Sequence, residues 1–351
     1  DRIFPKLPNN VDEYLRNAYK GGCCMVGEKY QNVIADTYSY DINSMYPSQL
    51  KYQKLPFGVP HYFTGKYSGD KLYVQHLKAS FNIKNKKLPC IQLKHTRIFQ
   101  DNEWIKNCNY QMELYLTNID LDLFFDNYDV YDLEYIDGYE FESIRGLFSE
   151  YIDKWYNIKM NTHDKGERAF AKLFLNNIYG KFGTNPHRKS GRFGLINGVV
   201  KKVETIDEDV DTVYLPIAIF TTSYARAMLI KNAQTQFDDF MYCDTDSIHF
   251  NKPAKYLKID NHKLGFFKYE YKGVGKHLKQ KTYIVHETED GEGNPIDVWN
   301  VTCAGLNKDV LQKENIKVDF EMFKLGAKFN KLKMKKVIGG CYLSKEEHTI
   351  K

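Results

Sequence analysis

Two aspartates one residue apart, Asp244 and Asp246, are the residues best suited to chemistry in this chain of 351 amino acids. They lie in the run Tyr242-Cys243-Asp244-Thr245-Asp246-Ser247, within a pattern typical of two short paired strands. Because side chains alternate along an extended backbone, we expect both carboxylates on one face and Thr245 on the other. Carboxylates that close are costly unless a cation lies between them. The motif therefore indicates a divalent metal site, and phosphoryl transfer is the first chemistry to consider.

Asp41 supplies a third carboxylate. Residues 33–42 predict a strand that ends at Asp41, and residues 43–50 predict a short helix broken by Pro47. An in-line nucleotidyl transfer with two metal ions needs carboxylates that bridge both ions, and Asp41 with the hairpin aspartates would supply them. Backbone amides after Asp41 could hold phosphate oxygens, and Tyr46 would then wall off the sugar.

Each carboxylate motif also has a simpler interpretation. Asp, Thr and Ser side chains bond their own backbone in tight turns, so an isolated Asp-Thr-Asp is more often a turn than a metal site. In the same way, Asp41 at a strand end could merely cap the turn that follows. Only the combination with other parts of the chain favours the chemical interpretation.

A predicted helix that leads into Gly180 carries a polar stripe on one side. Its members are spaced four, four and three residues apart, and they are Arg168, Lys172, Asn176 and Tyr179. The apolar residues on the other side, Phe170, Leu173 and Phe174, are expected to be buried. The two cations could grip a triphosphate and the phenol could stack on a base, with Gly180 permitting close approach. A solvated basic face is the alternative.

The elements that must position these residues give an α+β organisation. Helical periodicity over residues 148–182 breaks at Lys165-Gly166 and predicts two antiparallel helices. Asn197-Gly198 between apolar-rich arms predicts a protruding β-hairpin over residues 191–203. Residues 217–236 predict a further helix, and residues 51–146 form a mixed stretch of short strands with a helix near residues 120–128.

Composition limits the class of protein. A chain of this length with 42% hydrophobic residues can form a multi-lobed globular enzyme. Fifty basic against 45 acidic residues give a net charge of +5, which points to nucleic acid only if the basic residues cluster. Seven cysteines without paired spacing indicate a reducing cytoplasm. No window has the pattern of a membrane span or a signal peptide.

The three blocks together resemble motifs A, B and C of family B DNA polymerases. The matching segments are Asp41-Ile42-Asn43-Ser44-Met45-Tyr46-Pro47-Ser48, Lys172-Leu173-Phe174-Leu175-Asn176-Asn177-Ile178-Tyr179-Gly180 and Tyr242-Cys243-Asp244-Thr245-Asp246-Ser247. Tyr19-Lys20-Gly21-Gly22 looks like the Tyr-x-Gly-Gly linker of the protein-primed polymerases of small tailed phages, and Lys281-Thr282-Tyr283 looks like their Lys-x-Tyr motif. Residues 221–226 resemble a segment that contacts the primer terminus in that group. The likeness runs from Phe4 to Lys351.

This resemblance implies a right-hand architecture with an antiparallel-sheet palm, helical fingers, a small thumb and two inserted modules. The implied segments are palm 1–52, an insertion 53–147 like the first terminal-protein region, fingers 148–183, a β-arm 184–215 like the second such region, palm 216–306 and thumb 307–351. Relatives of this branch carry a proofreading exonuclease domain before the linker, and we expect no such domain within this chain.

The resemblance also implies roles for individual residues. Asp41, Asp244 and Asp246 would be the catalytic carboxylates and, with the Ile42 carbonyl, the metal ligands. Tyr46 would exclude the ribose 2′-hydroxyl, with Ile42 also touching the nucleotide side of the site. The other nucleotide contacts would be Lys159, Arg168, Lys172, Asn176 and Tyr179, and the DNA contacts would be Tyr19, Gly21, Gly22, Asn43, Ser44, Gly180, Thr222, Arg226, Lys281 and Tyr283.

The implied function is a processive, strand-displacing DNA-directed DNA polymerase that extends a DNA or protein primer with two Mg²⁺ ions, for which Mn²⁺ can substitute. Expected partners are primer-template DNA, deoxynucleoside triphosphates and a terminal protein. The chain would act as a monomer or as a heterodimer with that protein, in a host cytoplasm and away from membranes. One alternative is a catalytically silent scaffold that binds DNA or terminal protein. Another is a different templated polymerase, such as a reverse transcriptase, in which adjacent aspartates are more usual.

Overall fold

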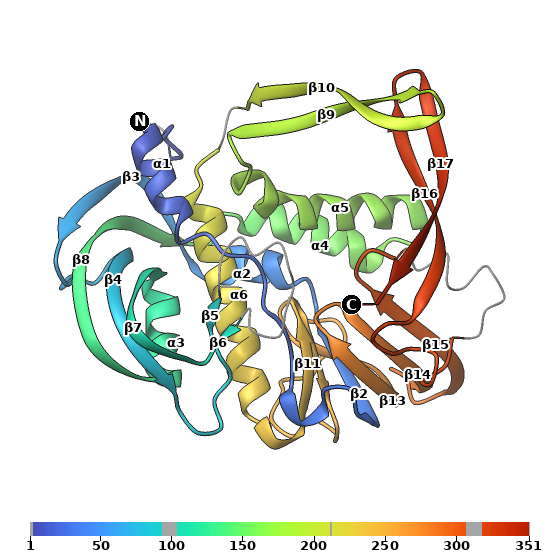
Figure 1. The fold of residues 1–351 in the computed structure, drawn as a ribbon. Helices are drawn as coiled ribbons and strands as arrows, with labels where there is room; N and C mark the ends of the chain where they lie inside the picture. The colour runs from blue at the N-terminus through green and yellow to red at the C-terminus, as the bar shows by residue number, and fades with distance from the viewer. Residues whose placement is uncertain (1–2, 93–103, 211–212, 307–317, 351) are drawn as a thin grey trace.

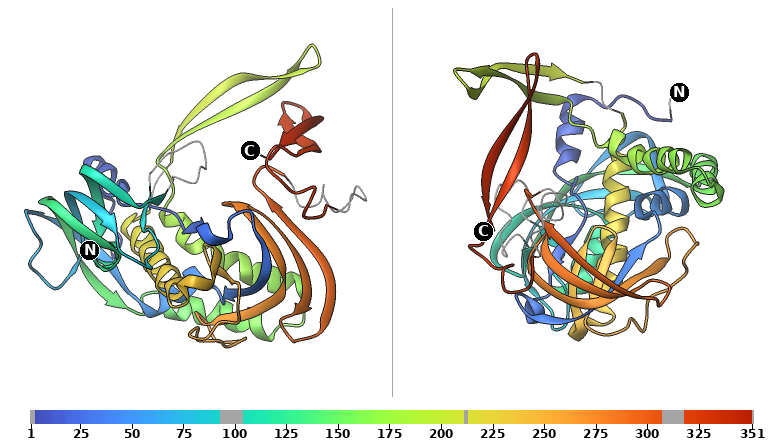
Figure 2. Two further views of the ribbon diagram at one scale, coloured as in Figure 1. Left: turned by 60° about the horizontal axis from the view of Figure 1, so that its bottom comes forward. Right: turned by 90° about the vertical axis from the view of Figure 1, so that its right-hand side faces the viewer.

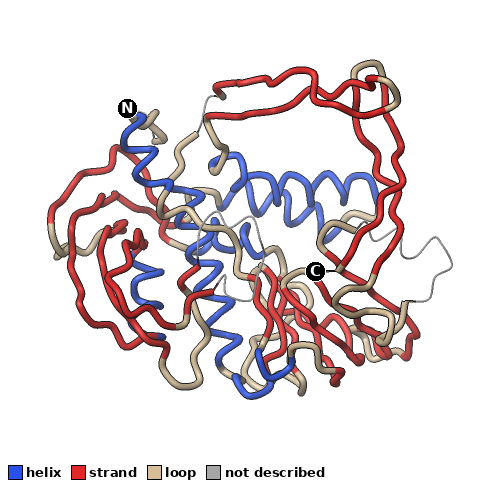
Figure 3. Tube along the Cα trace, in the orientation of Figure 1, coloured by secondary structure: helices blue, strands red, loops and turns tan. Residues whose placement is uncertain are grey.

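The computed structural model of the chain describes residues 3–92, 104–210, 213–306 and 318–350. Within these ranges, two antiparallel sheets and six α-helices make up the body, and two long β-hairpins extend from it (Figure 1). The tube in Figure 3 shows strands on both sides of a helical centre. No described helix is both long and apolar enough to cross a membrane. The antiparallel sheets and separate helices confirm the α+β class predicted from the sequence.

The central sheet has seven strands in the order β1-β11-β12-β2-β13-β14-β15. Its members are β1 (Cys24–Val26), β2 (Ile34–Ile42), β11 (Phe240–Asp244), β12 (Ser247–Phe250), β13 (Phe267–Lys279), β14 (Thr282–Asp290) and β15 (Pro295–Cys303). β2 lies in the middle, where Asp41 pairs with Ser247 on β12 and with Lys268 on β13. The Asp41 strand and the Asp244 hairpin are therefore neighbours in space, although they are far apart in sequence.

Helix α6 (Pro216–Gln234) packs between the central sheet and a four-stranded side sheet (Figures 1 and 3). The side sheet has the order β3-β8-β4-β7. Its members are β3 (Lys54–Thr64), β4 (Leu72–Ile83), β7 (Asn107–Thr117) and β8 (Tyr128–Arg145), with α3 (Asn118–Asn127) packed against them. Fourteen residues of α6 are buried and they occur on every side of the helix, so α6 is a core helix rather than an amphipathic surface helix.

Helices α4 (Ser149–Asn161) and α5 (Lys165–Phe182) form the predicted helical pair, with one correction to their boundary. The break falls at residues 162–164 rather than at Lys165-Gly166. Asp164 explains the difference, because its side chain accepts a hydrogen bond from the Glu167 N–H and caps α5. Gly166 therefore lies within the first turn of α5 instead of interrupting the helical pair.

The buried side of α5 also differs from the prediction. The buried residues are Ala171, Leu175 and Phe182. By contrast, Phe170 and Leu173 are 63% and 53% exposed, and Phe174 is exposed beyond its stacking contact with Trp155. The prediction was wrong because it assigned the most apolar sector to the core. In the structure, the sector that carries Ala171, Leu175 and Phe182 is the one that is buried.

Two long hairpins extend from the body and touch near their tips. The long arm consists of β9 (His187–Ile196) and β10 (Val199–Asp209), and the C-terminal arm consists of β16 (Lys328–Val337) and β17 (Gly340–Thr349). Asn197 and Gly198 both have positive φ, as the predicted Asn-Gly hairpin turn requires. The Ile338 N–H donates a hydrogen bond of 2.8 Å to the Phe193 carbonyl, so the arms meet above the body (Figures 1 and 2). Residues 307–317, where the predicted thumb begins, lie outside the described residues.

Helix α2 (Met45–Tyr52) follows the Asp41 strand, and Pro47 does not break it. Pro47 is the third residue of the helix, and N–H groups in the first turn have no helical partner to lose. Ser44 precedes the helix in the left-handed conformation, with φ of 52°. The remaining short elements are α1 (Asn9–Arg16), η1 (Glu28–Tyr30), β5 (Ile91–Gln92), β6 (Trp104–Ile105) and η3 (Phe237–Asp239).

Candidate active site

The Asp244 hairpin is confirmed, but its turn corrects the predicted geometry of the aspartates. Asp244 ends β11 and pairs with Ser247, so Thr245 and Asp246 alone form the turn, and Thr245 has a positive φ of 57°. Asp246 therefore lies in a turn, where the predicted alternation of side chains does not apply. The Ile42 N–H donates a hydrogen bond of 2.7 Å to the Asp246 carbonyl and pins the turn to the end of β2. The turn itself thus carries Asp246 to Asp41.

Asp41 and Asp246 form the electrostatic centre of the site. Burial, and then the charges of Asp246 and Glu270, raise the pKa of Asp41 to about 7, while the Lys268 charge acts in the opposite direction. Burial and the charge of Asp244 raise the pKa of Asp246 to about 6. Two shielded carboxylates that repel each other are stabilised by a cation between them. The chemistry of this pair therefore fits a hard divalent ion that takes oxygen ligands.

Asp244 has a different partner. The Lys281 amine donates hydrogen bonds of 2.8 Å to each carboxylate oxygen of Asp244, and the Tyr242 hydroxyl donates one of 3.3 Å. Across the described ranges, no three His, Cys, Asp or Glu side chains are grouped to hold one ion. The charge of Asp246 acts on Asp41 and the charge of Asp244 acts on Asp246, so the three carboxylates lie in one region, and Asp244 in addition pairs with the Lys281 amine. The Lys281 amine is therefore the cation that Asp244 contacts in this structure.

Cations on α4 and α5 lie near the carboxylates. The Lys159 amine donates a hydrogen bond of 2.9 Å to the Ser44 hydroxyl. Burial lowers the pKa of Lys159, the charges of Lys172 and Arg168 lower it further, and the charge of Asp41 raises it. Because each of these charges acts on Lys159, the three cations and Asp41 share one region. Positive charge beside a carboxylate pair suits a metal-bound polyphosphate.

Two tyrosine rings from different helices pack against each other at a tilt beside the site. The ring centroids of Tyr46 on α2 and Tyr179 on α5 are 3.9 Å apart, with an interplanar angle of 32°. Gly22 packs against the same place, since a Cβ there would lie 3.0 Å from the Tyr46 hydroxyl and 2.8 Å from the Thr245 Oγ1. The predicted linker, the predicted sugar-excluding ring and the Asp244 hairpin therefore meet at one point.

Tyr19 of the linker and two residues of the polar side of α5 lie at the C-terminal half of that helix. The Tyr19 hydroxyl lies against Gly183 at the end of α5, where a Cβ would come within 2.2 Å of it. Asn176 and Gly180 are exposed on α5, and no atom lies within 4 Å of the position of a Cβ at Gly180. The structure thus leaves open space where the sequence predicts contact with a base pair.

Two predicted DNA contacts lie inside the protein instead. The buried Thr222 hydroxyl donates hydrogen bonds to carbonyls of its own helix. Arg226, which is 2% exposed, donates to the carbonyls of Lys20 and Gly21 at 2.8 and 3.0 Å and to the Asp120 carboxylate at 2.6 Å. The prediction that these side chains contact DNA is therefore corrected, because both are enclosed by protein. Arg226 positions the linker.

Asn43 and Tyr283 also have protein partners. The Asn43 amide donates to the carbonyls of Asp260 and Lys263 at 2.7 and 3.2 Å, which ties the end of β2 to a loop. The Tyr283 ring packs against Tyr242, with centroids 5.0 Å apart, and burial raises its pKa. Asn43 thus fixes the end of the Asp41 strand, and Tyr283 packs against the Asp244 hairpin through Tyr242.

Asp120 is the candidate that sequence reasoning missed. It accepts hydrogen bonds from Arg226, 106 residues away, and from Ser223 at 2.7 Å. Its one local signal is Thr117-x-x-Asp120, a pattern typical of a helix start, and the Thr117 side chain does cap α3. Nothing in that pattern names Arg226 as the partner.

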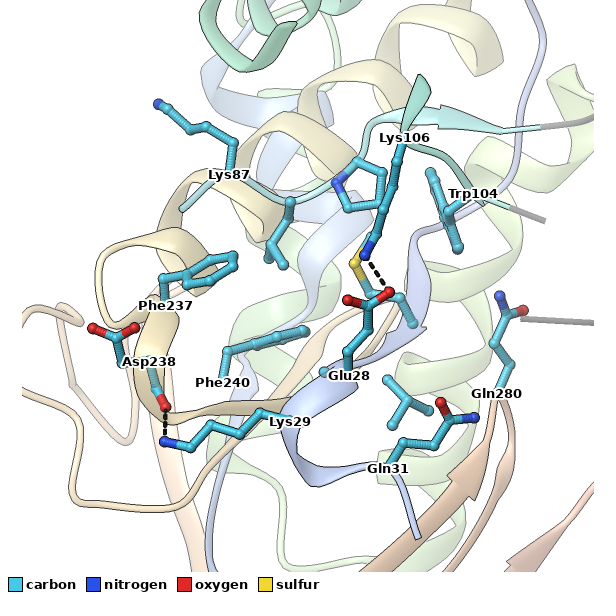
Figure 4. Close-up of a pocket in the computed structure, with 15 residues that line it drawn as sticks. Glu28, Lys29, Gln31, Lys87, Trp104, Lys106, Phe237, Asp238, Phe240 and Gln280 are labelled. Carbon is cyan, nitrogen blue, oxygen red and sulfur yellow. Dashed lines mark hydrogen bonds and ion pairs between the residues drawn. The ribbon is translucent and has the colours of Figure 1, made fainter. Parts of the chain in front are cut away.

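A separate hollow of about 270 Å³ lies beside β1 (Figure 4). Its wall includes Trp104 and Phe240, and ion-paired or hydrogen-bonded lysines stand at its edge, with Lys106 bonded to Glu28 and Lys29 to the Asp238 carbonyl. None of the three site aspartates lines it. The hollow is therefore distinct from the candidate active site.

Fold and site together match those of a family of DNA polymerases. Residues 1–263 match the family of DNA polymerases of type B, organellar and viral, and the chain belongs to that family. Membership implies a general dependence on divalent metal ions. The chain is 38% identical to the DNA polymerase of Bacillus phage B103 and 37% identical to that of Bacillus phage phi29, in each case over all of this chain and 64% of the relative.

The solved structures agree with the sequence relatives. The phi29 DNA polymerase complexed with primer-template DNA and incoming nucleotides superposes on this chain with a TM-score of 0.90 and 34% sequence identity. The match covers all of this chain and 64% of the phi29 chain. The binary complex of the same polymerase with primer-template DNA gives a TM-score of 0.87. The chain thus spans somewhat less than two thirds of the length of the relatives it matches.

Proposed function

We propose that this chain carries the polymerising centre of a DNA-directed DNA polymerase, which adds deoxynucleotides to a primer paired with a DNA template. The observation that carries the proposal is the Asp41–Asp246 pair, two shielded carboxylates with raised pKa values next to cations on α4 and α5. The relatives named above are DNA polymerases, which supports the same activity.

The residues of the site divide the work. Asp41 and Asp246 would hold the divalent ions, Mg²⁺ or Mn²⁺, with Asp244 as the third carboxylate, and Lys281 would contact the primer terminus. Bound ions supply activation of the attacking hydroxyl and stabilise the leaving pyrophosphate in an in-line displacement. The cations Lys159, Arg168 and Lys172 hold the triphosphate. The Tyr46 ring excludes the ribose 2′-hydroxyl, and Asn176 with Tyr179 contacts the new base pair beside Gly180.

The hairpin arms and the side sheet take the remaining roles. The contact between Phe193 and Ile338 supports a closed path around duplex DNA, which would keep the enzyme bound and part the strands ahead of it. Residues 53–147 and 184–215 would bind a terminal protein whose hydroxyl serves as the first primer. The chain would work in the host cytoplasm, as a monomer or paired with that protein.

Primer extension on a primed DNA template tests the activity. Asp246→Ala and Asp41→Ala should reduce primer extension to background. Both variants should keep their affinity for DNA, because these carboxylates bind the metal ions and not the DNA duplex. Asp36→Ala is the matched control, an exposed aspartate on the same strand as Asp41. Extension that survives in Asp246→Ala would reject the metal assignment, and an inactive wild-type chain that still binds DNA would favour the silent scaffold.

Two further experiments distinguish the remaining alternatives. An RNA template in place of DNA identifies a reverse transcriptase, which would extend on it with comparable efficiency. A labelled deoxynucleotide incubated with candidate terminal proteins tests protein priming, since a labelled protein adduct forms only if a side-chain hydroxyl accepts the nucleotide.

A further inference from the structure

The backbone at Gly22 is enclosed by two residues of the site. A Cβ at this position would lie 2.8 Å from Oγ1 and 3.1 Å from Cγ2 of Thr245, and 3.0 Å from the Tyr46 hydroxyl. Thr245 presents both branches of its side chain to Gly22, so rotation about χ1 exchanges one close contact for another. Any side chain at residue 22 therefore has to displace the hairpin turn or Tyr46.

The linker is held in place by a buried arginine. Arg226 holds the carbonyls of Lys20 and Gly21, the two residues before Gly22. The guanidinium is in turn fixed by the Asp120 carboxylate and the Ser223 hydroxyl, at 2.6 and 3.1 Å. Because this network is buried and holds the two residues before Gly22, a group added at Gly22 presses on Thr245 and Tyr46 rather than moving the linker.

Tyr46 is one of the two residues, with Thr245, that a side chain at position 22 would meet. Its ring is held between the Gly22 backbone and the Tyr179 ring, whose centroid lies 3.9 Å away. The proposed function makes the same ring the part that excludes the ribose 2′-hydroxyl. Its selectivity then depends on where the linker allows the Tyr46 hydroxyl to lie.

We propose that Gly22 is a specificity-determining position: the bare backbone of the linker sets the Tyr46 ring and thereby the discrimination between deoxyribonucleotides and ribonucleotides. The inference rests on the proposed function and adds a residue outside the nucleotide pocket to sugar selection. In sugar selection Gly22 acts through Tyr46, so this role is one of positioning.

The test compares Gly22→Ala with Gly21→Ala. Both variants add one methyl group to the same linker, but no atom lies within 4 Å of a Cβ at Gly21. The measured quantity is kcat/KM for a deoxynucleotide divided by that for the matching ribonucleotide, on a saturating primer-template. A single methyl group in a packed site changes selectivity by roughly tenfold or more, so Gly22→Ala should lower this ratio by about that factor. Gly21→Ala should leave the ratio at the wild-type value, whatever it does to DNA affinity.

Two second substitutions, each combined with Gly22→Ala, distinguish the effect of Tyr46 from that of Thr245. Tyr46→Phe removes the hydroxyl that the new methyl group would meet, so Gly22→Ala should lower the ratio much less in that background. Thr245→Ala relieves only the hairpin and should restore kcat for both sugars without restoring the ratio. An unchanged ratio in folded Gly22→Ala would overturn the inference, and so would an equal loss in the Tyr46→Phe background.

A readout without catalysis distinguishes failure of this inference from failure of the proposed function. If the wild-type chain extends no primer, the proposed function fails, but the packing argument is still measurable. The fluorine NMR signal of fluorotyrosine at position 46, assigned by its loss in Tyr46→Phe, should shift in Gly22→Ala and stay in place in Gly21→Ala. A signal that does not move in Gly22→Ala would show that the linker does not position the ring.

Discussion

The Lys281 amine lies 2.8 Å from both carboxylate oxygens of Asp244. Asp244 is the last residue of β11, just before the two-residue turn that leads to β12. Lys281 lies in the two-residue turn between β13 and β14 and has a positive φ of 52°. Burial opposes the charge on Lys281, yet the hydrogen bond and the charge of Asp244 raise the pKa of the amine overall. Lys281 is thus a resident cation at a carboxylate that the proposed chemistry assigns to a metal ion.

Removal of this amine should change metal dependence and activity in opposite directions. In Lys281→Gln, Asp244 loses its competitor, so half-maximal stabilisation by Mg²⁺ should occur at a lower concentration in thermal melts. Primer extension should nevertheless fall, because the proposed contact with the primer terminus is lost. Lys279→Gln, two residues earlier at the end of β13, is the matched control. Unchanged Mg²⁺ dependence in Lys281→Gln would show that the amine does not compete for Asp244.

The raised pKa values of Asp41 and Asp246 predict a pH-dependent response to metal. In the folded chain these values are about 7 and about 6. The ordinary value of an aspartate is about 4. The folded state therefore binds more protons than the unfolded state between these limits, and the stability due to both groups is lost as pH rises through the folded pKa values. Added Mg²⁺ should raise the melting temperature more at about pH 8 than at about pH 5.5.

The control for this experiment is a chain without the two charges. Asp41→Asn with Asp246→Asn should melt with little dependence on pH in the same window and should respond weakly to Mg²⁺ at either pH. An equal response of the wild-type chain at both pH values would mean that the carboxylate pair does not bind the ion.

The Asp120–Arg226 pair should dominate the stability of the linker. The two side chains lie 2.6 Å apart and are 10% and 2% exposed. Removing one member of a buried pair leaves an uncompensated charge and costs roughly 3–5 kcal/mol of unfolding free energy. Asp120→Ala should show this loss in chemical denaturation, whereas Asp122→Ala on the same helix should cost far less. A loss below about 1 kcal/mol in Asp120→Ala would mean that water or another group replaces the carboxylate.

The contact between the two arms predicts retention on circular DNA. Cysteines at Phe193 and Ile338, in a background with the exposed Cys341 replaced by serine, can be joined by a short bifunctional maleimide. Chains that are cross-linked after loading should leave a primed circular template severalfold more slowly at high salt than uncross-linked chains. A linear template with free ends should release both forms at similar rates. Equal release from the circle would exclude a closed path around DNA.

The sequence predicted those parts of the fold that depend on local pattern. The Asn197-Gly198 turn, the hairpin at Asp244 and the strand that ends beside Asp41 each need only a few neighbouring residues to specify them. Helix boundaries were less accurate. Asp164 displaced the start of α5 because a capping residue outweighs a Gly two positions later.

Packing decided what local pattern could not. Phe170 and Leu173 read as core residues, but the neighbours of α5 cover the other sector of the helix. The family resemblance assigned Arg226 to DNA, whereas in the structure Asp120 and the Lys20 carbonyl enclose its side chain. The cation at Asp244 is Lys281, which reaches this carboxylate from a different hairpin. All three outcomes depend on contacts between distant parts of the chain.

The order of strands in the central sheet has a consequence for biosynthesis. β2 pairs with β12 and β13, so its partners leave the ribosome only after the side sheet, α4, α5 and the long arm have been made. Contacts of such long sequence range form slowly. Until they form, both edges of β2 lack partners, and exposed strand edges promote aggregation. Slower translation between β2 and β13 should therefore lower the yield of folded chain, whereas slower translation after β15 should affect that yield less.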